Sequence, residues 1–129
     1  MANLFQPPYV YRGTVHRVID GDTAVISLDV GFGIILKNRK VRLAGINAKE
    51  LSEPGGQDAK VALEQMIREF GQPDPANDGT TLLIATKLDK NDKYGRILGR
   101  LLGVDRTMDN MPVDINAEMV HAGFATEAK

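Results

Sequence analysis

The sequence predicts an α+β fold in which a five-stranded antiparallel β-barrel is closed by helices. Two observations support this prediction. Three stretches rich in β-branched residues follow one another at the start of the chain, separated by turn-forming residues. The apolar residues then take helical spacing for one segment, and two further strand-like stretches and a short helical one follow. With 129 residues, the chain is long enough for one domain with a single core.

The first three predicted strands form a meander. The turns between them are indicated by Asp20-Gly21 and by Gly31-Phe32-Gly33, the second of which could also be a bulge. The third strand is expected to be bent or interrupted by the polar residues 37–40. The three predicted strands are Tyr9–Ile19, Thr23–Val30 and Ile34–Ile46.

A helix is expected next, because the apolar residues of Asp58–Phe70 fall on one helical face. Gly71 ends this helix, and Gln72–Gly79 is predicted to be a polar loop. Two more strands, Thr80–Leu88 and Ile97–Val104, are then joined by the charged hairpin 89–95.

The last part of the chain is predicted to hold a surface loop, Asp105–Pro112, and a short helix. Asp114 is a suitable N-cap for this helix, and Gly123 is a suitable end. Three meander strands, a helix, two strands and a helix are the element order of an OB-type barrel. Such barrels commonly bind oligonucleotides on one face.

Composition narrows the class of protein. The chain has no cysteine, which excludes disulfides, thiolate metal sites and a cysteine nucleophile. No apolar stretch approaches the ~20 residues of a membrane-spanning helix, and residues 1–8 lack the features of a signal peptide. We therefore expect an intracellular protein without a membrane partner, with an N-terminal extension over residues 1–8 and one domain over residues 9–129.

Positive charge is concentrated in two windows, although the whole chain has a net charge of −1. Residues 37–49 contain five cations and no acid, and residues 87–100 contain five cations and two acids. A charge run is usually a solvated face, but both of these runs adjoin the candidate site residues. This arrangement favours a track for a polyanion such as DNA or RNA, with salt-sensitive binding.

Asp20-Gly21-Asp22-Thr23 is the first segment with candidate chemistry. Asp and Gly suit the dihedral angles of a hairpin, so a turn alone can explain the segment. The functional alternative is that Asp22, at the start of a strand, offers its carboxylate to a hard cation such as Ca²⁺. Asp20 is then expected to bond turn amides.

The second segment runs from Arg42 to Glu50. Arg42 lies within an apolar strand, where an unpaired charge is costly, so it needs an anion. That anion is either an acidic side chain or a substrate phosphate, which a guanidinium can hold by two oxygens. Glu50 is either an ordinary loop acid, like Glu53, or a carboxylate beside a metal-bound water.

The third segment is Asp92-Lys93-Tyr94-Gly95-Arg96. A charged hairpin tip and a functional role are equally good explanations of this segment. In the functional interpretation Arg96 projects toward a phosphate opposite Arg42, and Lys93 and Tyr94 are candidate nucleic-acid contacts.

Together these segments resemble the staphylococcal nuclease family. The family pattern combines an Asp-Gly-Asp-Thr turn, an Arg-Leu strand that leads to a proline and a glutamate, and an Asp-Lys/Arg-Tyr-Gly-Arg motif. Residues 116–120 with 123–125 also resemble the family's helix after the last barrel strand. The resemblance implies an OB-type barrel and a Ca²⁺-dependent nuclease. It further implies that Asp22 is a Ca²⁺ ligand, that Arg42 and Arg96 are phosphate clamps, and that Glu50 is the base or orients the attacking water.

The sequence departs from the family pattern in ways that bear on activity. Asn47 stands in place of a second metal-ligand carboxylate, and Lys49 in place of a proline. The Asn47 amide oxygen and the Ala48 carbonyl can still bind a cation, with binding weaker by ~1–4 kcal/mol for the missing charge. The sequence also stops soon after Gly123, so we expect the C-terminal helix region to be truncated and the flank left behind to favour a homodimer.

The sequence thus predicts a Ca²⁺-dependent nuclease that hydrolyses phosphodiester bonds of DNA, with RNA as the second substrate class. The resemblance further implies products with 3′-phosphate ends. The alternative is a catalytically inactive OB-type module that binds nucleic acid or protein, which the substitutions at Asn47 and Lys49 favour. The other site residues of the family pattern are all present, and this favours the enzyme.

Overall fold

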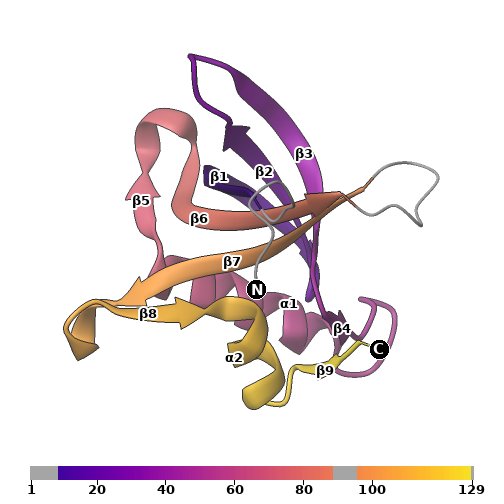
Figure 1. Cartoon of the computed structure of the whole chain (residues 1–129). Helices are drawn as coiled ribbons and strands as arrows, with labels where there is room; N and C mark the ends of the chain where they lie inside the picture. The colour runs from indigo at the N-terminus through magenta and orange to yellow at the C-terminus, as the bar shows by residue number, and fades with distance from the viewer. Residues whose placement is uncertain (1–8, 89–95, 129) are drawn as a thin grey trace, which may run out of the picture.

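A computed structural model of the chain describes residues 9–88 and 96–128. Its centre is a ring of five strands (Figure 1). Neighbouring strands pair antiparallel except for β3 and β7, whose parallel pairing closes the ring. The predicted five-stranded OB-type barrel is therefore confirmed, with one parallel pair in place of a wholly antiparallel ring. The five strands are β1 (Tyr9–Asp20), β2 (Thr23–Asp29), β3 (Ile35–Leu43), β6 (Gly79–Leu88) and β7 (Ile97–Asp105).

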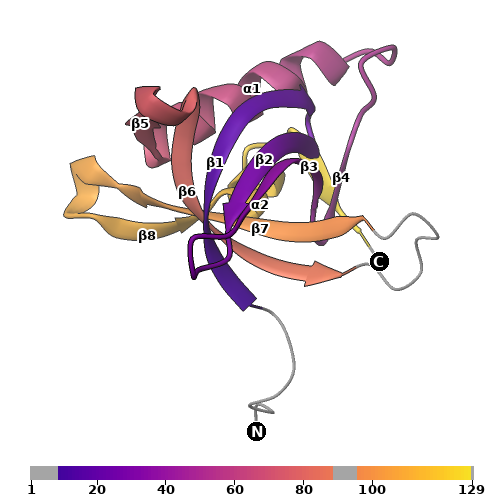
Figure 2. The same cartoon turned by 90° about the horizontal axis from the view of Figure 1, so that it is seen from above.

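The core fills the barrel and the space between the barrel and its helices. Helix α1 (Gly56–Phe70) runs alongside the barrel, as Figure 2 shows, and buries the apolar face that the sequence predicts. Helix α2 (Ile115–His121) inserts Ile115 and Met119, which are fully buried. Within the described residues, neither helix is long and apolar enough to cross a membrane.

The predicted third strand, Ile34–Ile46, is wrong in its extent. It divides into β3, which ends at Leu43, and the short strand β4 (Ile46–Ala48). The chain turns between them at Gly45, whose φ of +76° is a conformation that glycine adopts without strain. The predicted irregularity at the polar stretch is present as a bulge, in which Lys37 and Asn38 both stand opposite Ser27.

Two segments predicted to be loops contain short strands. The segment Gln72–Gly79 holds β5 (Gln72–Asp74), which pairs with β6, and a 3₁₀ turn over Pro75–Asn77. The segment Asp105–Pro112 holds a 3₁₀ turn over Arg106–Met108 and the start of β8 (Met111–Asp114), which pairs with β7. Strands this short and polar lack the apolar alternation by which a sequence indicates a strand.

The ends of the helices follow the predicted caps closely. Helix α1 begins at Gly56 instead of Asp58. Asp114 caps α2, because its side chain accepts a hydrogen bond from the backbone N–H of Ala117. Gly123 follows α2 with a positive φ.

The chain continues after α2 into β9 (Ala125–Glu127), a strand that the sequence did not indicate. Strand β9 pairs antiparallel with β4, and Ala125 stands opposite Ala48. Figure 1 shows the two strands side by side at the lower right. This pairing holds the segment after Arg42 in place from the outside of the barrel.

Candidate active site

Four of the predicted site residues meet at one rim of the barrel. Asp22 stands where β2 begins, and its carboxylate Oδ2 lies 2.8 Å from Nη1 of Arg42 on β3. The same Oδ2 accepts a hydrogen bond of 2.8 Å from the backbone N–H of Ala48 on β4. The Nη2 group of Arg42 donates to the amide oxygen of Asn47. One guanidinium thus lies between the carboxylate and the amide oxygen that the sequence proposes as cation ligands.

The turn between β1 and β2 positions this cluster. A Cβ atom on Gly21 would lie 2.7 Å from the Cβ atoms of both Ala48 and Ala59, so only glycine lets the turn pack against β4 and α1. Asp20 accepts a hydrogen bond of 3.0 Å from the backbone N–H of Asp22, which is the turn role predicted for it. Burial raises the pKa of Asp20, and its hydrogen bond with the Asp22 carboxyl raises it further.

The structure answers the question of which anion Arg42 contacts within the chain. Its partner is Asp22, because Thr23 stands opposite Arg42 in the β2–β3 register and brings the preceding residue within reach. The Arg42 side chain is 21% exposed and that of Asp22 is 12% exposed. The pair is therefore shielded from most solvent, while the guanidinium keeps a face through which it could contact a substrate.

Arg96 reaches the same part of the barrel from the neighbouring strand. It immediately precedes β7, in which Ile97 pairs with Val41 and Leu98 with Arg42. Arg96 is exposed and takes part in an interaction within the chain. The other predicted residues of its motif, Lys93 and Tyr94, lie outside the described residues, as does the N-terminal extension over residues 1–8.

Glu50 lies in the exposed turn that leads from β4 to α1. Its backbone N–H donates to Oε1 of Glu53, and the N–H of Glu53 donates to the Glu50 carbonyl, both at 2.9 Å. Across residues 9–88 and 96–128, the Glu50 carboxylate forms no hydrogen bond or ion pair. The turn is therefore held by the Glu50 backbone and the Glu53 side chain, and the Glu50 carboxylate takes no part in holding it.

A hollow of about 510 Å³ lies beside β4 and includes residues that the sequence did not bring into the site. Asn47 and Ala48 line it together with the acids Glu53 and Asp58. The sequence indicates Asp58 only as a helix residue, because its place beside this hollow depends on how α1 packs. A larger hollow of about 750 Å³ on the outer face of the barrel is lined by none of the predicted site residues that the structure describes.

The donor set at the rim suits a hard cation in its chemistry. The Asp22 carboxylate, the Asn47 amide oxygen and the Ala48 carbonyl are all oxygen donors, which Ca²⁺ prefers. In the part of the chain that the structure describes, no three His, Cys, Asp or Glu side chains gather in a metal-binding arrangement. The residues therefore fit a cation with one protein carboxylate, provided that Arg42 turns away from Asp22 and Asn47.

Asp22, Arg42, Asn47 and Ala48 form the rim cluster of this barrel. Together the barrel and this cluster define an OB-type domain in which an arginine of β3 contacts a carboxylate at the end of the β1–β2 hairpin. The chain belongs to the staphylococcal nuclease homologue family, whose sequence model matches residues 40–129. The resemblance inferred from the motifs is thereby confirmed, and the family match supports a nuclease-type function.

Two relatives extend this comparison. The chain is 32% identical to "Protein ParB" of Escherichia coli over 117 residues, which cover 88% of this chain and 55% of ParB. It is 28% identical to "Endonuclease YhcR" of Bacillus subtilis (strain 168) over 123 residues, which cover 89% of this chain and 9% of YhcR. The chain thus spans about half the length of the first relative and about a tenth of the second.

Proposed function

We propose that the chain is a Ca²⁺-dependent nuclease that hydrolyses phosphodiester bonds of DNA, with RNA as the second substrate class and 3′-phosphate ends as products. The observation that supports it best is the partly exposed Arg42 guanidinium held beside Asp22 and Asn47. The family match and the name of the endonuclease relative support the same reaction class. Four parts of the proposal come from the sequence alone, namely Lys93 and Tyr94 as nucleic-acid contacts, a homodimer and an intracellular location.

In this mechanism the two arginines bind the scissile phosphate. Arg42 exchanges its contacts with Asp22 and Asn47 for phosphate oxygens, and Arg96 approaches from the neighbouring strand. Their positive charges stabilise the negative charge that builds up on the phosphate in the transition state.

Glu50 supplies the base. Its carboxylate accepts a proton from the water whose oxygen bonds to phosphorus, while the bond from phosphorus to the 5′ oxygen breaks and that oxygen takes up a proton from solvent and leaves as a hydroxyl group. Ca²⁺ would be held by Asp22, Asn47 and the Ala48 carbonyl, and when bound it withdraws charge from a phosphate oxygen.

The direct test is cleavage of single-stranded and duplex DNA with Ca²⁺, with Mg²⁺ and with EDTA. Cutting should require Ca²⁺, and Glu50→Gln should slow it by roughly 10²–10⁴-fold because the base is lost. Glu69→Gln, at an exposed position near the end of α1, is the matched control and should cut at the wild-type rate. Equal rates for the two variants would contradict the role given to Glu50.

One observation favours a second candidate function, an inactive OB-type module that binds nucleic acid or protein. The cluster has one carboxylate, and Asn47 bonds to Arg42 through its amide oxygen. Such a module should bind oligonucleotides in a salt-sensitive way and should not cut them, whichever cation is added. The same cleavage assay therefore separates the two functions.

Restoring the missing acid tests the metal role of residue 47. Asn47→Asp should tighten Ca²⁺ binding by roughly tenfold to a thousandfold, because it adds a unit charge about 4 Å from the cation. Isothermal titration calorimetry measures this directly. Asn110→Asp makes the same charge change in an exposed turn and should leave the affinity almost unchanged. If Asn47→Asp binds Ca²⁺ no better than the wild type, residue 47 is not a ligand.

A further inference from the structure

The hairpin between β2 and β3 ends in an aromatic residue that folding does not explain. Gly31, Phe32 and Gly33 all have positive φ, of 89°, 58° and 75°. A bulky residue in this conformation is strained, and the Phe32 side chain is fully exposed, so no burial compensates for the strain. The turn itself is well formed, since Val30 N–H donates to the Ile34 carbonyl at 3.1 Å.

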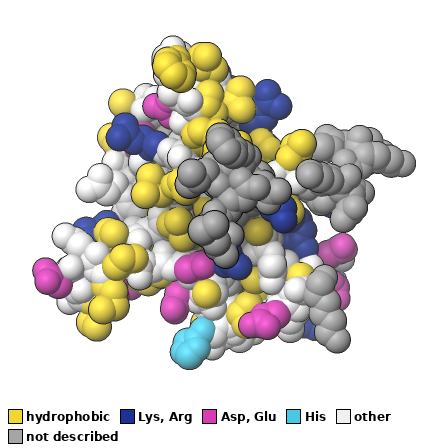
Figure 3. Space-filling model, in the orientation of Figure 1, with side chains coloured by type: hydrophobic (Ala, Val, Ile, Leu, Met, Phe, Trp, Pro, Cys, Tyr) yellow, Lys and Arg dark blue, Asp and Glu magenta, His cyan; other side chains and the backbone are white. Residues whose placement is uncertain are grey.

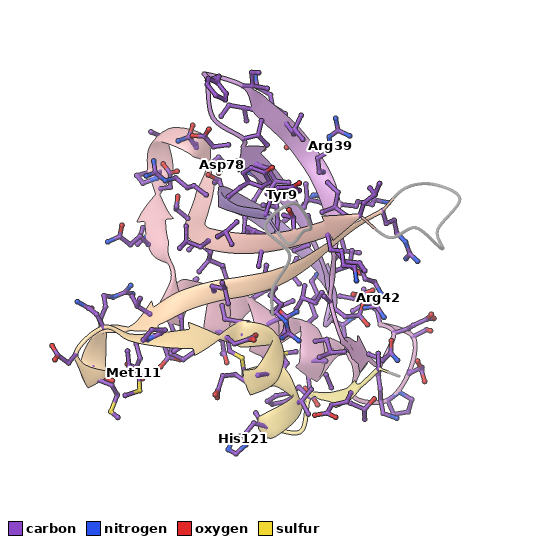
Figure 4. All side chains as sticks on the ribbon, in the orientation of Figure 1. Tyr9, Arg39, Arg42, Asp78, Met111 and His121 are labelled. Atoms are coloured by element: carbon purple, nitrogen blue, oxygen red, sulfur yellow. The ribbon has the colours of Figure 1, made fainter. Side chains whose placement is uncertain are left out.

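The strand that leaves this hairpin is lined with positive charge. Lys37, Arg39 and Lys40 are all exposed. Lys40 and Arg42 flank the buried Val41, so both point to the outside of the barrel. In Figure 4, Arg39 and Arg42 lie on the same side of the molecule, with Arg39 nearer the hairpin. Figure 3 shows apolar side chains at the top of the molecule, where the tip lies, and Lys and Arg side chains just below.

Among the described residues, one backbone edge of the same strand has no strand partner along these cations. Within residues 9–88 and 96–128, β7 pairs with β3 only over Val41–Leu43, while β2 covers the other edge. Lysines on an open edge can serve simply to prevent edge-to-edge aggregation. That explanation accounts for the charges and leaves the strained, exposed Phe32 unexplained. A second copy of the chain is also a poor occupant, because two such basic edges would repel each other.

We propose that the β2–β3 hairpin and the exposed part of β3 form a binding site for single-stranded nucleic acid that leads to Arg42. Phe32 stacks on an unpaired base, and Lys37 and Lys40 contact phosphates between that base and the rim cluster. The inference rests on the proposed function, since it extends the substrate path of the same site. Aromatic stacking beside a positive groove is the general means by which OB-type barrels hold single strands.

The dimensions suit such a path. Between Ile35 and Arg42 the β2–β3 ladder advances six steps, because the bulge takes up one residue, and this is about 20 Å at ~3.3 Å per step. At ~3.4 Å per nucleotide of a stacked strand, this length corresponds to about six nucleotides, within the ~4–16 that a single OB fold covers. The site would therefore be filled by an oligonucleotide and left empty by a dinucleotide bound at Arg42.

The test uses the full chain in EDTA, so that binding is measured without cleavage. The chain has no tryptophan and three tyrosines, so Phe32→Trp introduces a single tryptophan at the tip, which can be excited selectively at about 295 nm. Its emission should be quenched by a 16-nucleotide single-stranded thymidine oligomer and not by a blunt duplex. Unchanged emission at saturating oligomer, or equal quenching by the duplex, would overturn the stacking role.

Affinity variants give a second readout. Phe32→Ala should weaken binding of the oligomer roughly 5- to 150-fold, and Lys40→Ala should reduce the slope of log affinity against log salt by about one. Phe32→Gly relieves the positive φ, so it should melt no lower than the wild type and still bind weakly. Met111→Ala removes another exposed apolar side chain, 56% exposed, from β8 at the far end of the molecule in Figure 4, and should bind normally. The proposal would be overturned if Phe32→Ala and Phe32→Gly both bound the oligonucleotide with wild-type affinity. It would also be overturned if these variants changed the oligomeric state of the protein and left its affinity for the oligonucleotide unchanged.

Cleavage data distinguish this inference from the proposed function. If both hold, Phe32→Ala raises KM for long single strands, while kcat and the cleavage of a dinucleotide stay at wild-type values. If only the nuclease is right, Phe32→Ala cuts long strands with the wild-type KM. If only the binding site is right, the oligomer quenches the tryptophan of Phe32→Trp although no variant cuts.

Discussion

Replacing Arg42 by alanine should abolish cleavage and at the same time tighten Ca²⁺ binding. The loss of cleavage follows if the guanidinium neutralises the transition state, for which a fall in kcat of about 10³-fold or more is usual. The tighter binding follows from geometry. Arg42 Nη1 lies 2.8 Å from Asp22 Oδ2, so the wild-type chain must break this contact before Asp22 can face a cation. Without Arg42, the carboxylate is available and a repelling charge is gone, which should raise Ca²⁺ affinity roughly tenfold or more.

The two readouts separate a catalytic Arg42 from a structural one. Asp22 keeps its hydrogen bonds from Ala48 N–H and the Thr23 hydroxyl, so the fold should survive the substitution. Arg68→Ala removes an exposed arginine from α1, away from the cluster, and should change neither cleavage nor Ca²⁺ binding. Weaker Ca²⁺ binding by Arg42→Ala would contradict the competition described here, and an unfolded Arg42→Ala would assign this arginine to structure.

The barrel was predictable because its long strands carry their own signals. Strands β1 and β6 contain stretches in which buried and less buried residues alternate, β2 is a mostly apolar run with three consecutive buried residues, and the turns between the first three strands contain Gly or Asp. Strands β4 and β9 were not predictable, because each has three residues and each is defined by the other. A pairing between Ala48 and Ala125 leaves no local pattern in the chain.

The site was predictable in its residues but not in its contacts. The motifs indicated that Arg42 needs an anion and left an acid or a phosphate as alternatives. The acid is Asp22 because of the β2–β3 register, and that register passes through the bulge at Lys37 and Asn38. A shift of one residue in pairing reverses which side chains face the core. Because the sequence does not show where the bulge lies, it cannot specify the contact between Arg42 and Asp22.

Asn116 is a structural residue whose importance the sequence indicated only weakly. The sequence places it in the helix that resembles the family's and indicates no role of its own for it. A polar residue next to Ile115 on the buried face of a short helix is a signal that it bonds inside the protein. Asn116 is fully buried, and each polar atom of its side chain has a backbone partner.

Replacing Asn116 by alanine should lower the free energy of unfolding by about 2–5 kcal/mol. The Asn116 Oδ1 atom accepts a hydrogen bond of 3.1 Å from Leu101 N–H, and Nδ2 donates to the carbonyls of Ala44 and Gly99 at 2.9 Å each. These bonds continue the β3–β7 pairing beyond Leu43, at the point where the barrel closes. Alanine leaves the Leu101 N–H and the Ala44 carbonyl buried without this partner, at roughly 1–3 kcal/mol for each group. Urea denaturation measures the loss, and His121→Ala at the exposed end of α2 should cost little.

Asn116→Asp makes the same argument testable by pH. The shape is unchanged, but an oxygen now faces the two carbonyls, and burial raises the pKa of the new carboxyl above its value in the unfolded chain. The folded variant then binds a proton that the unfolded chain has released, so its stability relative to wild type falls as pH rises between the two pKa values. Over that interval the deficit should grow by about 1.4 kcal/mol per pH unit. Denaturation at pH 5 and pH 7 should therefore show a smaller deficit at pH 5, where a protonated carboxyl can donate to one of the carbonyls as the amide did. A deficit that is equal at both pH values would mean that residue 116 is hydrated in the variant, and that its hydrogen bonds do not hold the barrel closed.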